Sequence, residues 1–175
     1  SARRTSCAGL GPLQLVVQRR SNDGGTIAHV AAENGKRHSL DWIRECPNLG
    51  ISFLERVRTN GWTIAHAAAA HGKLSVLTWI RDLPDRGREL MKQVSNKGWT
   101  VAHVAAAHGK EDVLETIRET SGLGLDYLMK LSKRGLTIGH VAAAHGQLSV
   151  LKWICSCQGL GVHFLKYTVD DGSTI

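Results

Sequence analysis

The chain has 175 residues and a mass of 19.0 kDa, which suits one globular domain or one short repeat array. Aromatic residues make up only 5% of it, which argues against a single core of large side chains, and no apolar run is long enough to span a bilayer. The formal net charge of +7 favours an acidic partner, nucleic acid or an anionic membrane surface.

The cysteines give a prediction about location. Cys7, Cys46, Cys155 and Cys157 form no CxxC pair and show no zinc-ligand spacing. Free thiols are typical of a reducing compartment. We therefore expect an intracellular protein, cytoplasmic or nuclear, that has no cofactor and no metal site.

Four positions recur along the chain at a constant step of 37 residues. They are Gly24, Gly61, Gly98, Gly135 and Gly172; Thr26, Thr63, Thr100, Thr137 and Thr174; His29, His66, His103 and His140; and Gly35, Gly72, Gly109 and Gly146. This period predicts repeats one to four at residues 24–60, 61–97, 98–134 and 135–171. Residues 1–23 are then part of a preceding repeat and residues 172–175 the start of a fifth, so we expect a segment of a longer protein.

Each repeat predicts the same order of elements. A glycine lies in a polar turn, where a positive φ is accessible to it, and the threonine two residues later suits a helix N-cap. The histidine three positions on stands where a capping box has Glu or Gln, so its ring can bond back to the threonine and the loop. An alanine-rich short helix follows, then an amphipathic second helix such as KLSVLTWIRD, and finally a helical turn such as RELMKQV.

This pattern, T-x-x-H-x-A-A-x-x-G followed by an amphipathic helix, resembles the ankyrin repeat, whose signature is T-P-L-H-x-A within a period of 33 residues. The resemblance spans residues 24–171 and implies an all-α solenoid of stacked helix–turn–helix repeats joined by fingers or loops. The chain departs from the signature in its longer period and in having Ile27, Ile64, Val101 and Ile138 in place of the proline. We expect the added residues between the second helix and the next turn, where the finger is shortened or partly helical.

The tryptophans divide into two groups. Trp42, Trp79 and Trp153 lie on apolar faces of the second helices, so we predict that all three are core residues. Trp62 and Trp99 instead follow turn glycines, at a position where other repeats have Gly, Leu or Ser. Since tryptophan is enriched in binding hot spots, we interpret these two as partner contacts, with packing on the adjacent finger as the alternative.

The histidines form two sets. The set that begins at His29 is expected to be structural, because packed helices lie about 8–10 Å apart, too far for two rings to share one metal ion. The second set is His71, His108 and His145, with Asn34 at the equivalent position, near the end of the short helix. These are either exposed residues that favour a helix C-terminus, or a row of imidazoles that contact a partner and gain charge below about pH 6.5.

The segments that lead into the turns are basic in the middle of the chain. The charges are Arg56, Arg58, Lys92, Lys97, Lys130, Lys133 and Arg134. If they line one edge of the array, they form a positive strip beside Trp62 and Trp99. An ordinary solvated face is the alternative reading of such a run.

The sequence shows no phosphate-binding glycine loop, no Cys–His or Ser–His–Asp arrangement, and no pair of carboxylates linked to an apolar pocket. We therefore expect no enzymatic activity, but a scaffold for protein–protein interaction that binds an acidic partner through finger tips and inner helices, as the resemblance implies. Its predicted partner-binding residues are Trp62, Trp99, His71, His108, His145, Arg56, Arg58, Lys92, Lys97, Lys133 and Arg134. The alternatives are an electrostatic nucleic-acid or anionic-lipid binding module, or the targeting segment of a larger enzyme.

Overall fold

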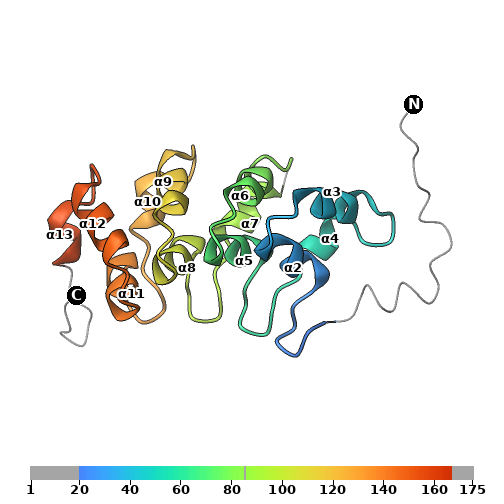
Figure 1. Ribbon diagram of the computed structural model, residues 1–175, viewed down its shortest axis with the longest axis horizontal. Helices are drawn as coiled ribbons and strands as arrows, with labels where there is room; N and C mark the ends of the chain where they lie inside the picture. The colour runs from blue at the N-terminus through green and yellow to red at the C-terminus, as the bar shows by residue number, and fades with distance from the viewer. Residues whose placement is uncertain (1–19, 85, 167–175) are drawn as a thin grey trace.

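The structure is a computed structural model that describes residues 20–84 and 86–166. These residues form twelve helices and no strand, so the predicted all-α class is confirmed. The helices fall into groups of three along the chain, and Figure 1 shows these groups following one another along the long axis of the molecule. The groups are α2 (Ile27–Glu33), α3 (Arg37–Glu45) and α4 (Gly50–Leu54); α5 (Ile64–Ala70), α6 (Leu74–Arg81) and α7 (Gly87–Lys92); α8 (Val101–Ala107), α9 (Glu111–Glu119) and α10 (Gly124–Leu128); and α11 (Ile138–Ala144), α12 (Leu148–Ser156) and α13 (Gly161–Leu165).

Each group lies within one 37-residue interval of the sequence pattern. The first helices α2, α5, α8 and α11 pack side by side, and each second helix packs on the first helix of its own group. A third short helix follows the second helix in every group, as the helical-turn interpretation predicted. Most of the predicted preceding repeat (residues 1–19) and the predicted start of a fifth (172–175) lie outside the described residues.

A reciprocal hydrogen-bond pattern starts each first helix. At α5, the Oγ1 of Thr63 accepts hydrogen bonds from the backbone N–H groups of Ala65 and His66, at 3.2 and 3.4 Å. In return, Nδ1 of His66 accepts from the backbone N–H of Thr63 at 3.3 Å. The same capping box is present at α2, α8 and α11, so the predicted role of these histidines at the helix start is confirmed.

The second ring nitrogen of these histidines reaches the next repeat. Nε2 of His66 lies 3.0 Å from the carbonyl oxygen of Trp99, and the equivalent contacts join His29 to Trp62 and His103 to Leu136. Because Nδ1 accepts from a backbone N–H, Nε2 must carry the proton and donate to the carbonyl, which assigns a neutral ring. Burial lowers the pKa of His66 to about 4, and it also lowers the pKa values of His29 and His103.

The turn tips of neighbouring repeats are joined by their backbones. A ladder of N–H to carbonyl hydrogen bonds runs along them, from Thr59 to Asp23 (2.9 Å), from Asn96 to Asn60 (3.0 Å) and from Lys133 to Lys97 (3.1 Å). The tips therefore lie along one side of the row in Figure 1, opposite α3, α6 and α9.

This close approach predicts different effects for two glycine substitutions. Gly98 (φ +74°) and Gly146 (φ +67°) both have a left-handed backbone, which costs a non-glycine residue about 1–2 kcal/mol. A Cβ on Gly98 would also lie 2.6 Å from the backbone nitrogen of Lys133, whereas one on Gly146 has no neighbour within 4 Å. We expect Gly98→Ala to lower the melting temperature by several degrees more than Gly146→Ala, as measured by circular dichroism. Equal shifts in melting temperature for the two variants would contradict the close approach of the turn tips at Gly98 and Lys133.

The core runs along the row of helices. All of α5 and α8 is buried, because alanine side chains allow the first helices to approach closely on both sides. Behind them, Trp79 is 6% exposed, as predicted, and Trp153 packs against the core while remaining partly exposed. The prediction that Trp42 is a core residue is wrong. Its side chain is 42% exposed, because no described element covers the outer side of α2 and α3.

Candidate functional site

Trp62 and Trp99 lie where the turn tips lead into α5 and α8, and both side chains are partly exposed. The indole of Trp62 stacks on His66 at a ring-centroid distance of 6.3 Å and meets the edge of His108 at 6.2 Å. Trp99 meets His145 in the same edge-on way, at 5.9 Å. Each tryptophan therefore contacts the histidine at the end of the first helix in the following repeat.

The histidines of this second set are exposed and are also tied to their own helices. Nδ1 of His108 lies 2.9 Å from the carbonyl oxygen of Val104, and His71 and His145 make the equivalent contact. At the same position in α2, the side-chain amide of Asn34 donates to the carbonyl of Val30. The two interpretations from sequence are thus compatible, since these rings satisfy helix carbonyls and still present a face to solvent.

The tryptophan–histidine pairs follow a spacing that the sequence already contained. Trp62 precedes His108 by 46 residues, as Trp99 precedes His145. The residue 46 positions before His71 is Gly25, so the sequence has no tryptophan at the position that would pair with His71. A search at the 37-residue period compares equivalent positions only, which is why sequence analysis missed these pairs.

Two of the predicted basic contacts are engaged within the protein. The side chain of Arg58 is only 14% exposed and forms ion pairs with Asp23 (3.2 Å) and with Glu33. The guanidinium of Arg56 lies over the ring of Phe53, 4.7 Å from its centroid. These two side chains therefore contribute little to an open positive strip.

The other predicted basic residues are exposed. Nζ of Lys97 lies 5.7 Å from the ring centroid of Trp99, and the backbone N–H of Lys133 bonds to the carbonyl of Lys97. Arg134 is next to Lys133 at the tip, and Lys92 ends α7. The exposed positive charge at the tips therefore comes from the ends of repeats two and three, and Lys97 lies next to Trp99.

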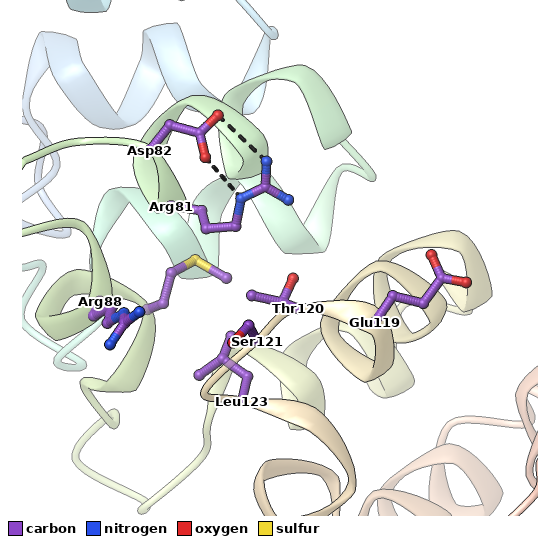
Figure 2. A pocket seen from close by; sticks show the side chains of 8 residues that line it. Arg81, Asp82, Arg88, Glu119, Thr120, Ser121 and Leu123 are labelled. Atoms are coloured by element: carbon purple, nitrogen blue, oxygen red, sulfur yellow. Dashed lines mark hydrogen bonds and ion pairs between the residues drawn. The ribbon is translucent and has the colours of Figure 1, made fainter.

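A separate groove lies between repeats two and three and has a volume of about 340 Å³ (Figure 2). It is lined by Arg81, Asp82, Arg88, Met91, Glu119, Thr120, Ser121 and Leu123. Figure 2 shows Arg81 paired with Asp82, at 2.8 and 3.3 Å, while Arg88 and Glu119 lie on opposite sides. Sequence analysis did not single out this groove, because its residues come from three separate elements. Its charges do not converge on one ligand position.

Two further findings concern the described residues alone. Within residues 20–84 and 86–166, no three side chains of His, Cys, Asp or Glu lie close enough together to hold a metal ion. Over the same ranges, every helix is too short or too polar to cross a membrane.

Comparison of the chain with protein-family models and with curated proteins finds no match. The class of the protein is therefore given by its fold, an all-α chain in which groups of three helices repeat along one axis.

Proposed function

We propose that the chain is an ankyrin-like solenoid and that it acts as a non-enzymatic scaffold for protein–protein interaction. The threonine–histidine capping box, the closely packed alanine-rich first helices and the amphipathic second helices behind them support this fold. The three described cysteines, Cys46, Cys155 and Cys157, are free thiols, which supports an intracellular location.

The observation that carries the proposal is the row of indole and imidazole rings on repeats two to four. Trp62, His108, Trp99 and His145 are at least partly exposed, and edge-on ring contacts hold them in place. Rigid aromatic side chains bury a large area at a small entropy cost, so they are effective anchors for a protein partner. Lys97 beside Trp99 favours an acidic segment of that partner.

The distribution of charge favours a protein over nucleic acid. Of the arginines, Arg58 pairs with Asp23 and Glu33, and Arg44, Arg81 and Arg118 pair with acidic residues on their own helices or immediately after them. Within the part of the chain that the structure describes, these arginines therefore do not add to a continuous basic surface along the aromatic row. Binding to phosphates depends on many free cations, so nucleic acid remains the second candidate.

The test uses a partner captured by the full chain and identified, whose dissociation constant is then measured by calorimetry at low and high salt. We expect Trp62→Ala combined with Trp99→Ala to weaken binding by about tenfold or more at both salt concentrations, because hot-spot residues contribute about 2 kcal/mol or more. Leu148→Ala, which truncates an exposed apolar residue of α12, is the matched control and should change little.

The opposite outcome would identify a phosphate binder. Affinity would then fall by about 10³-fold or more between 50 and 200 mM salt. Neutralising Lys97 and Lys133 would abolish binding, and the tryptophan substitutions would leave it unchanged. That result would contradict the proposed function.

A further inference from the structure

The groove in Figure 2 crosses the interface between repeats two and three. Arg88 lies on its repeat-two side, and Ser121, in the turn that follows α9, lies on its repeat-three side (Figure 2). Both side chains are exposed. In the part of the chain that the structure describes, neither the hydroxyl of Ser121 nor the guanidinium of Arg88 has a hydrogen-bond or ion-pair partner. The interface therefore holds a free hydroxyl from one repeat and a free cation from the other.

Both residues depart from the repeat pattern. The residues equivalent to Arg88 are Ile51, Leu125 and Val162. Ile51 and Leu125 pack against the core, so the packing of a repeat does not require a charge at this position. The residues equivalent to Ser121 are Pro47, Pro84 and Gln158. The pairing of an arginine with a hydroxyl is therefore particular to this one interface.

The register of the repeats shows what Arg88 faces. Leu125, one period later, lies against Gly159 of the following repeat. In the same way, Cζ of Arg88 lies 3.9 Å from the position that a Cβ on Gly122 would occupy. Gly122 directly follows Ser121, and neighbouring Cα atoms are only about 3.8 Å apart. The guanidinium therefore lies within reach of a group attached to Oγ of Ser121.

Further donors surround the turn. Ser121 also borders a second hollow, whose lining includes Lys92 and Lys130. The backbone N–H groups of Ser121 and Gly122 have no hydrogen-bond partner within the described residues. These groups, like Arg88, can only donate, so they suit a group that brings acceptor oxygens.

The acidic residues around the turn oppose such a group only weakly. Asp82 pairs with Arg81, and Glu119 lies 3.5 Å from Arg118. Asp126, which lines the second hollow, is exposed to solvent. Positive charge therefore remains in excess beside Ser121.

The sequence around Ser121 also suits a modifying enzyme. Protein kinases select substrates partly by charge pattern, and basophilic kinases read an arginine three residues before the acceptor. Arg118 has this spacing to Ser121, and arginines also precede Ser6, Thr59 and Thr137 by three residues. Ser6 lies outside the described residues, Thr59 donates its hydroxyl to a backbone carbonyl at 3.0 Å, and Thr137 is buried. Of the three described hydroxyls, Ser121 is the free one.

We propose that Ser121 is a phosphorylation site and that Arg88 of the preceding repeat binds the phosphoryl group across the interface between repeats two and three. In this step Oγ of Ser121 attacks the γ-phosphorus of ATP held by a protein kinase. The Oγ–P bond forms, the bond from the γ-phosphorus to the bridging oxygen breaks and ADP leaves, while the hydroxyl proton passes to the aspartate base of the kinase. The inference does not rest on the proposed partner-binding row.

Phosphorylation should stabilise this interface. A phosphoserine carries about −1.5 to −2 charges at pH 7 and three acceptor oxygens, so it accepts charge-assisted hydrogen bonds from a guanidinium. In the unmodified protein the charges of the groove do not converge on one position, and the phosphoryl group supplies that position. The modification therefore links the two repeats.

The first test uses the full chain with phosphoserine incorporated in place of Ser121. It is compared with the unmodified chain, each with and without Arg88→Gln, so that the four proteins form a double-mutant cycle. Lys152→Gln removes an exposed positive charge from α12 and is the matched control. We expect phosphorylation to raise the melting temperature by about 2 °C or more with Arg88 or with Lys152→Gln, and by much less with Arg88→Gln.

The ³¹P resonance of the phosphoserine gives a readout that does not depend on stability. A nearby cation favours the dianion, so its titration midpoint should lie about 0.5 pH lower with Arg88 than with Arg88→Gln. This titration also decides if the modified chain proves less stable. The same midpoint in both proteins would overturn the proposed role of Arg88.

A second experiment tests Ser121 as the acceptor. The unmodified full chain is incubated with Mg²⁺, ATP and a protein kinase that selects arginine three residues before the acceptor, and mass spectrometry locates the modified residues. We expect phosphorylation of Ser121 that is lost in Ser121→Ala and reduced in Arg118→Gln, with Thr59 and Thr137 unmodified. Modification confined to residues other than Ser121 would overturn the proposal.

Discussion

Acidification from pH 7 to pH 4 is expected to lower the free energy of unfolding steeply, because the buried capping histidines are neutral in the folded state. The pKa of His66 falls from an ordinary value of 6.5 to about 4 through burial. Between these two pH values the unfolded chain binds a proton that the folded chain does not, so stability rises with pH in this window and is fully present above pH 6.5. For His66 alone the difference is of the order of 3 kcal/mol. His29 and His103 act in the same direction, since burial lowers their pKa values too.

Urea denaturation at a series of pH values between 7.5 and 4 measures this slope. The control is His66→Gln, because a glutamine at this position of a capping box can still bond to the helix start but does not titrate. We expect this variant to be less stable at pH 7 and to lose less stability on acidification than the parent. An unchanged pH dependence in His66→Gln would show that the ring does not carry the effect.

The substitution Phe53→Ala is expected to destabilise the protein by about 3–5 kcal/mol, the usual range for truncating a buried phenylalanine. Phe53 is 2% exposed in α4. Phe164 occupies the same position of the repeat in α13 but remains partly exposed, so Phe164→Ala should have a clearly smaller effect.

Chemical denaturation of the two variants measures the free energy of unfolding that each one loses. It tests whether this loss depends on burial in the stack rather than on the residue type. The comparison is matched, because the residue type and the repeat position are identical. Similar losses in both variants would count against the packing described for α4.

The sequence predicted local structure well, because local structure depends on residues within one repeat. The threonine and histidine three positions apart predicted the capping box, and the apolar spacing of RELMKQV predicted a helical segment where α7 lies. These features need no knowledge of what lies beside the repeat.

Features that depend on a neighbouring repeat, or on a distant element of the same repeat, were harder to predict. The apolar face that carries Trp42 has the pattern of a core face, and a pattern cannot say whether a neighbour covers it. Counting charges placed Arg58 in a positive strip, but its partner Glu33 lies 25 residues earlier in the same repeat, on α2, which a local charge count does not consider. The contact between Trp62 and His108 crosses from one repeat to the next, so the candidate site was predicted as separate residues rather than as pairs.

The bonds from Nε2 of His29, His66 and His103 to a carbonyl of the following repeat give the stack a direction. If a repeat frays, the imidazole of the repeat before it loses its acceptor, whereas the repeat after it keeps its own. Unfolding from either end breaks one such bond at each step. From the C-terminal end it leaves a buried imidazole N–H without its acceptor, and from the N-terminal end it leaves a carbonyl without its imidazole donor, so the group left behind differs between the two ends.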